Sequence, residues 1–219
     1  MLKYPCLILD HDDTVVQSET KLAYPFFCRI LEVFRPRQTI TLSEYVHDCH
    51  NLGFVGMCRQ RFQFTQEELA QEHAGWMEYI KTHVPPPYPG IDKLIHRQKQ
   101  EGGLICVVSH SSIQNISRDY EIHFGIQPDA IYGWDLPEHQ RKPHAFPLED
   151  IMRQYRLTPK DLLVVDDMKL AWQMASPLGV EIAFAAWSKP EFPDLSEEMR
   201  QLCDYSFDSV EMLENFLFE

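Results

Sequence analysis

Basic residues are scarce in this sequence, and their scarcity restricts what the protein can bind. The chain carries 20 Lys and Arg against 33 Asp and Glu, which gives its 219 residues a formal net charge of -13. No basic stripe runs along any segment, whereas nucleic acids and anionic membrane surfaces both favour basic patches. We therefore expect neither a nucleic-acid partner nor a membrane partner.

Long apolar runs and paired cysteines are also missing. No apolar run reaches the roughly 18 residues that a membrane-spanning helix needs, and the first strand begins so early that we expect no signal peptide. The six cysteines are scattered, with no C-x-x-C motif, which favours reduced thiols and a cytoplasmic location. Since 44% of the residues are hydrophobic, the chain can form a packed globular core.

Short apolar runs alternate with helical patterns over the second half of the chain. The runs cover residues 104–108, 130–132, 162–165 and 181–185, and an earlier one covers residues 6–10. This alternation predicts an α/β fold with a Rossmann-like parallel sheet core. The stretch between the first two runs is much longer than one crossover helix requires, so we expect an insertion there. Residues 209–218 at the end of the chain predict a short helix.

The inserted stretch has helical patterning. Apolar side chains recur every fourth residue after Ser18, which predicts a helix that this serine caps: Leu22, Phe26, Ile30 and Phe34. Thr65 followed by Glu68 predicts a capping box at the start of another helix.

Two short segments mark the ends of the insertion. The proline-rich residues 85–90 cannot continue a helix and indicate the return to the core, and residues 15–17 form the other half of a predicted hinge. We therefore expect a core domain of residues 1–16 and 89–219 and an inserted α-helical cap domain of residues 17–88.

The most informative stretch is Asp10-His11-Asp12-Asp13-Thr14, which follows the first apolar run. Two carboxylates two residues apart at the end of a strand point toward the same small volume, and this geometry suits a divalent ion. Ligands of open parallel sheets also gather beyond the carboxyl ends of the strands. A solvated acidic loop would look the same, so the motif alone leaves both interpretations open.

Further polar groups follow the later apolar runs. Ser109 ends one run, Asp166 and Asp167 end another, and Lys142 lies in the polar connection between them. Each is commonplace alone, since serines occur in turns and lysines on surfaces. With Asp10, their order along alternating strands and helices resembles the motif set of the haloacid dehalogenase superfamily of phosphotransferases. The resemblance covers nearly the whole chain.

The resemblance implies a Mg²⁺-dependent phosphatase, a phosphoric monoester hydrolase that acts on a small phosphorylated metabolite. Asp10 would be the nucleophile and form an aspartyl-phosphate, while Asp12 would protonate the leaving alcohol and later activate water. Four groups would contact the phosphoryl oxygens, namely the side chains of Thr14, Ser109 and Lys142 and the backbone N–H of His110.

The resemblance also implies a set of metal ligands. Asp10, the backbone carbonyl of Asp12 and Asp167 would hold Mg²⁺, and Asp166 would bond to a metal-bound water. Two positions depart from the usual pattern, because Asp13 stands where relatives carry glycine and His11 stands where an apolar residue is common. These departures put the rate of the reaction in doubt more than the fold.

Other functions stay open from the sequence. A phosphomutase resembling beta-phosphoglucomutase shares the motifs, and a catalytically weak phosphate-binding regulatory protein would keep the fold. A dehalogenase is disfavoured, because those relatives need neither the second acid nor the metal pair. The sequence does not set the oligomeric state.

The insertion contains two segments with more than one interpretation. Residues 47–50 (His-Asp-Cys-His) with Cys58 suggest a second metal site, but their spacing fits no common zinc framework, so polar helix faces are favoured. Residues 53–57 could form a turn that brings Arg59 or Arg61 to an anionic substrate. A simple helix connection with salt-bridged arginines explains them equally well.

Overall fold

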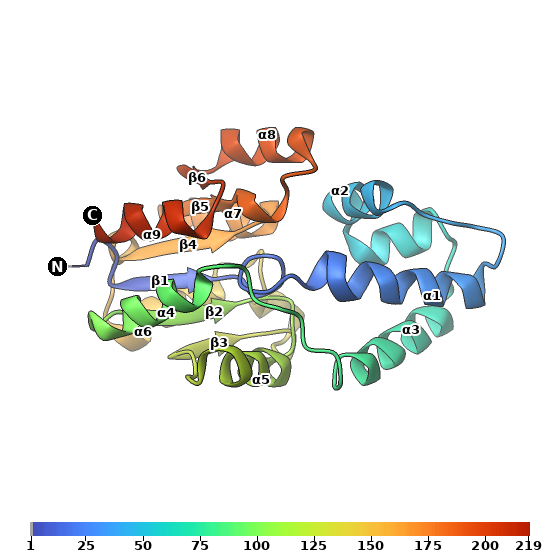
Figure 1. Cartoon of the computed structure of the whole chain (residues 1–219), viewed down its shortest axis with the longest axis horizontal. Helices are drawn as coiled ribbons and strands as arrows, with labels where there is room; N and C mark the ends of the chain where they lie inside the picture. Colours follow the sequence, from blue (N-terminus) through green and yellow to red (C-terminus); the bar gives the residue numbers. More distant parts are fainter. Residues whose placement is uncertain (1) are drawn as a thin grey trace. The chain divides into compact units, whose positions relative to one another are not determined.

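The computed structural model describes residues 2–219, in which the chain divides into two compact units (Figure 1). The core unit comprises Met1–Gln17 and Pro86–Glu219, and the helical unit comprises Ser18–Pro85. The predicted core domain (1–16 and 89–219) and cap domain (17–88) have their boundaries near these breaks in the chain. No helix among residues 2–219 combines the length and the apolar character that a bilayer crossing demands.

The core unit contains a parallel sheet, as predicted. Over the described residues it has six strands in the order β3-β2-β1-β4-β5-β6. They are β1 (Cys6–Leu9), β2 (Leu104–Val108), β3 (Ala130–Tyr132), β4 (Leu162–Asp166), β5 (Glu181–Ala185) and β6 (Tyr205–Phe207). The predicted strands are confirmed, with β1 ending one residue earlier and β4 one residue later than expected. The sequence analysis missed β6, which is only three residues long.

Helices cover both faces of the sheet (Figure 1). The side chains of β1 alternate, so that Leu7 and Leu9 pack on one face while Cys6 and Ile8 pack on the other. The first face is covered by α4 (Ile91–Gln100), α5 (Ile113–Phe124) and α9 (Val210–Phe218), and the second by α6 (Phe146–Tyr155) and α7 (Lys169–Ala175). Helix α8 (Pro193–Leu202) packs beside β5. The predicted helix at the end of the chain is confirmed as α9.

Short 3₁₀ turns join several of these elements. They are η2 (Glu138–Gln140), η3 (Pro159–Asp161), η4 (Ser176–Leu178) and η5 (Ala186–Ser188). The last of these follows β5 directly, at the same edge of the sheet as the acidic residues after β1 and β4.

The helical unit consists of η1, a π-helical turn (Glu19–Ala23), α1 (Tyr24–Phe34), α2 (Leu42–Gln60) and α3 (Gln66–Tyr79). The predicted capping box is confirmed, because Thr65 Oγ1 accepts from Glu68 N at 3.1 Å and Glu68 Oε2 accepts from Thr65 N at 2.8 Å. The predicted cap at Ser18 is wrong. The backbone of Ser18 is helical and its side chain makes no capping hydrogen bond. The turn η1 starts at the next residue and continues without interruption into α1.

The two chain segments at the ends of the insertion are hydrogen-bonded to each other. Gln17 N donates to Pro86 O at 2.9 Å and Tyr88 N donates to Val15 O at 2.9 Å, with an antiparallel bridge between Val16 and Pro87. Both segments belong to the core unit, so the point where the insertion leaves the core and the point where it returns are adjacent. Their role as a hinge stays a prediction.

Candidate active site

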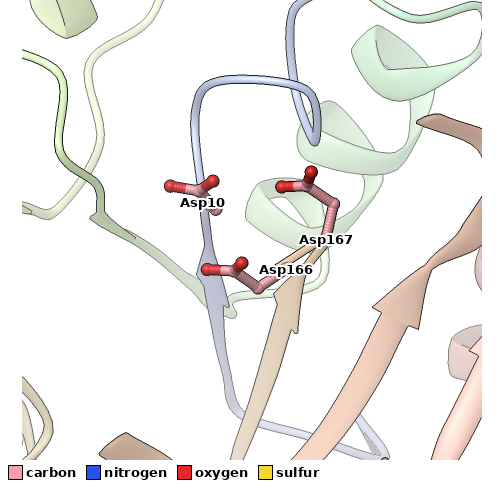
Figure 2. Close-up of side chains that lie close together, drawn as sticks. All are labelled: Asp10, Asp166 and Asp167. Carbon is pink, nitrogen blue, oxygen red and sulfur yellow. The ribbon is translucent and has the colours of Figure 1, made fainter. Parts of the chain in front are cut away.

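Three carboxylates meet at the carboxyl edge of the sheet, at the ends of β1 and β4. These strands pair with Leu9 opposite Val165, so Asp10 and Asp166 emerge side by side, and Asp167 follows (Figure 2). One oxygen from each carboxylate lies within 4.8 Å of the others. All three residues are at most 5% exposed, so their charges interact in a medium that screens poorly.

Lys142 lies between two of these acids. Its Nζ is 2.9 Å from Asp10 Oδ1 and 2.7 Å from Asp166 Oδ2, and its side chain is 4% exposed. Burial alone would lower the pKa of Lys142, but the carboxylates of Asp10 and Asp166 raise it above its ordinary value. Lys142 therefore stays an ammonium group inside the protein and offsets part of the acidic charge.

The third acid has a different counter-ion, which the sequence analysis did not identify. Lys189, which follows η5, places its Nζ 3.1 Å from Asp167 Oδ2 and 4.0 Å from Asp13 Oδ2. Tyr88 donates its hydroxyl to the other Asp13 oxygen at 3.4 Å. The signal in the sequence was weak, since residues 186–188 separate Lys189 from the apolar run that ends at residue 185.

Burial and mutual repulsion make the late acids hard to ionise. Desolvation and the Asp10 carboxylate raise the pKa of Asp166 well above its usual value, although Lys142 opposes the rise. Desolvation also raises the pKa of Asp167, while Lys189 acts in the opposite direction. A cation at this site would favour the ionised form of both acids.

The chemistry of these donors fits a divalent cation. Among residues 2–219, Asp167 Oδ1 is buried and accepts no hydrogen bond, which leaves its lone pairs for a ligand, whereas Asp10 Oδ1 faces the Lys142 ammonium group at 2.9 Å. Counted with Asp13, four buried carboxyl groups face two buried lysines, Lys142 and Lys189, so the lysines alone do not balance the charge when all four acids are ionised. Carboxylate oxygens are hard ligands of the kind that Mg²⁺ prefers.

The other predicted site residues lie at the same edge of the sheet. Ser109 follows β2 and is buried, and its Oγ accepts from Ser111 N at 3.2 Å. His110 pairs through Nε2 with the backbone carbonyl of Lys142 at 2.8 Å, and partial desolvation of the ring together with the Lys142 charge lowers its pKa. Thr14 Oγ1 is buried with no hydrogen-bond partner in the described chain.

The turn after β1 holds Asp12 and Asp13 by backbone hydrogen bonds. Asp13 N donates to Val16 O at 2.8 Å, and Val16 N donates to His11 O at 3.1 Å. Asp13 has a φ of 53°, in the left-handed region that aspartate tolerates better than most residues. Asp12 is half-buried, so it remains accessible to solvent.

His11 makes a buried hydrogen bond to Asp119 that the sequence analysis also missed. Its Nε2 lies 3.1 Å from Asp119 Oδ2, and the two side chains are 1% and 2% exposed. Arg118 contacts the other Asp119 oxygen at 2.6 Å. Asp119 lies three residues after the buried Ile116 on α5, so an acid on an apolar helix stripe was the available signal.

The two ambiguous segments of the helical unit have structural roles. Within the described chain, the one group of potential metal ligands is Asp10, Asp166 and Asp167, so the suggested second metal site is not formed. Arg61 pairs with Glu44 at 2.5 Å and Asp48 at 2.7 Å, while Arg59 donates to Gln66. Residues 53–57 continue α2 through a kink at Gly53, whose φ is 68°.

The sequence matches the family model of the haloacid dehalogenase-like hydrolases over residues 7–185. The chain therefore belongs to this family of haloacid dehalogenase-like hydrolases, as its motifs indicated. No curated protein matches the sequence.

Solved structures share the fold at low sequence identity. A putative phosphoglycolate phosphatase from Lactobacillus plantarum superposes with a TM-score of 0.78 at 18% identity, covering 97% of this chain and 99% of its own. A predicted phosphoglycolate phosphatase from Haemophilus somnus gives 0.73 at 19% identity, covering 99% of both chains. CbbY from Rhodobacter sphaeroides, solved in complex with xylulose-(1,5)bisphosphate, gives 0.73 at 19% identity, covering 95% of both chains.

Proposed function

We propose that this protein is a cytoplasmic, Mg²⁺-dependent phosphatase that hydrolyses a small phosphorylated metabolite through an aspartyl-phosphate on Asp10. The observation that carries the proposal is the buried convergence of Asp10, Lys142, Asp166 and Asp167 at one edge of the sheet, where Asp167 Oδ1 accepts no hydrogen bond from the described residues. A solvated acidic loop, the alternative from the sequence, would not be buried in this way.

The first half of the proposed reaction transfers the phosphoryl group to the protein. An oxygen of Asp10 attacks phosphorus while the ester P–O bond breaks, and Asp12 gives its proton to the departing alcohol oxygen. Lys142 offsets the negative charge of the phosphoryl group, and Ser109, Thr14 and the His110 backbone N–H donate hydrogen bonds to its oxygens. Asp12 suits the proton transfer because it is the acid of this turn that remains accessible to solvent.

The second half releases inorganic phosphate. The Asp12 carboxylate takes a proton from water, the water oxygen attacks phosphorus, and the bond between phosphorus and Asp10 breaks. Mg²⁺, held by Asp10, the Asp12 carbonyl and Asp167 with Asp166 nearby, would supply positive charge to the phosphoryl oxygens. The raised pKa values of Asp166 and Asp167 support this assignment, since a bound cation would favour the ionised form of both acids.

The substrate class rests on the relatives. Structural neighbours are described as phosphoglycolate phosphatases, and one was solved with a phosphorylated sugar. We therefore propose phosphorylated sugars and small phosphorylated carboxylic acids as the first compounds to test. We assign the selection among them to the inserted cap domain, residues 17–88.

Phosphate release from p-nitrophenyl phosphate and a panel of these metabolites tests the proposal. Activity should require Mg²⁺ and be lost in Asp10→Asn, and acid quenching of the wild type should trap phosphorus on Asp10. Asp92→Asn, which removes an exposed acid on α4, is the matched control and should retain activity. Product analysis with a hexose 1-phosphate separates the alternatives, because an isomer would indicate a mutase. No turnover of any substrate would indicate a binding protein.

A further inference from the structure

Lys189 is a second buried ammonium group in the acidic site, and the proposed reaction gives it no task. Its side chain is 5% exposed, and those of Asp167 and Asp13 are 3% and 8% exposed. Lys189 Nζ is 3.1 Å from Asp167 Oδ2, while Asp167 Oδ1 accepts no hydrogen bond from any described residue. One carboxylate therefore offers one oxygen to a lysine and has the other available for a cation.

A lysine and a divalent cation on the same buried carboxylate repel each other. The repulsion is strong because neither group is screened by water at this depth. When a cation approaches Asp167, Lys189 can lower this repulsion by moving toward another acid. Asp13 is the acid in reach, with Oδ2 4.0 Å from Lys189 Nζ.

Asp13 carries a buried charge that its backbone conformation does not require. Its φ of 53° is a conformation that asparagine adopts as readily as aspartate, so the backbone alone does not require a charged residue. The carboxylate is nevertheless 8% exposed and costly to bury without a positive neighbour. Lys189 supplies that charge.

We propose that Lys189 and Asp13 form an internal counter-ion pair that sets the affinity of Asp167 for the divalent cation. Lys189 neutralises Asp167 when no cation is bound, and Asp13 receives Lys189 when the cation binds. The pair keeps the acidic site stable without metal, at the cost of weaker metal binding. This inference rests on the proposed function, because it requires the cation to bind at Asp10 and Asp167.

Titration calorimetry of the full-length protein with MgCl₂ tests the inference without any measurement of activity. Lys189→Met removes the competing charge and keeps the apolar stem, so Mg²⁺ should bind about tenfold tighter. Asp13→Asn keeps the backbone conformation and removes the alternative partner, so binding should become weaker by a similar factor. The double variant should bind more tightly than Asp13→Asn alone. Lys169→Met, which removes an exposed lysine paired with Glu198, should bind like the wild type.

Two outcomes would overturn the inference. One is Lys189→Met binding Mg²⁺ no more tightly than the wild type, with an unchanged circular dichroism spectrum. The other is Asp13→Asn binding as the wild type does. If Lys189→Met does not fold, a crystal structure of the wild type with Mn²⁺ decides, because Lys189 Nζ must then lie closer to Asp13 than to Asp167. A different result would contradict the proposed function itself: Mg²⁺ binding that is unchanged in a double variant with Asp10→Asn and Asp167→Asn.

Discussion

Replacing Lys142 with methionine would remove the positive charge that separates two buried carboxylates. Its Nζ lies 2.9 Å from Asp10 Oδ1 and 2.7 Å from Asp166 Oδ2, and all three side chains are at most 5% exposed. Removing one partner of a buried ion pair leaves the other uncompensated, which typically costs about 3 to 5 kcal/mol. Methionine is close to lysine in length and fills the same space, so packing contributes little to the loss.

The free energy of unfolding in urea, measured at pH 8 without Mg²⁺, checks this value. Lys142→Met should lower it by about 3 to 5 kcal/mol. The matched control is Lys169→Met, which removes an exposed ammonium group and should lower it by less than about 1 kcal/mol. Millimolar Mg²⁺ should recover part of the loss, because the cation replaces the missing charge. A loss below about 1 kcal/mol in Lys142→Met would refute the reasoning, since it would mean that the acids are neutral or solvated.

Three further predictions follow from the buried charges. Millimolar Mg²⁺ should raise the Tm by about 5 to 10 °C in a thermal-shift assay. An equal rise in the double variant with Asp10→Asn and Asp167→Asn would contradict the metal site. Burial raises the pKa of Glu72 from 4.5 to about 7, so its folded-state pKa exceeds its unfolded value and stability falls as the pH rises between these two values. Glu72→Gln should therefore be more stable than the wild type at pH 8, by up to about 3 kcal/mol in urea unfolding, and equal to it near pH 4. Asp119→Asn should lower kcat for p-nitrophenyl phosphate about tenfold with KM unchanged, because Asp119 holds His11 in the turn after β1, which carries the proposed proton donor Asp12. An unchanged kcat would mean that the contact between His11 and Asp119 has a role in stability alone.

The fold could be predicted from the sequence because its strands are continuous apolar runs between helical patterns. The runs of β1, β2, β4 and β5 are almost entirely buried on both faces, which makes them stand out from their neighbours. Strand β6, Tyr205–Phe207, escaped because three residues with a central serine form no recognisable run. Ser18 was misread because its own backbone is helical, whereas a residue that caps a helix with its side chain normally has an extended backbone.

The candidate site could be predicted only in part. Asp10, Asp166 and Asp167 follow strands directly, so the rule that parallel strands end at one edge places them together. Lys189 reaches the site through a 3₁₀ turn, and Asp119 reaches His11 from the interior of a helix. Contacts of this kind depend on tertiary packing, because no local sequence pattern determines which buried acid contacts which basic side chain.

The backbone pairing between residues 15–17 and 86–88 affects which insertions the core unit can carry. Gln17 and Pro86 are joined by a hydrogen bond, so the core holds both ends of the insertion at a fixed, short separation. The entropy of closing such a loop grows only slowly with its length, so the sheet can carry a long insert or a short one at similar cost. Excision of residues 18–85 and closure with a few glycines should leave the strand register intact, and a foreign helical segment could be grafted at the same junction.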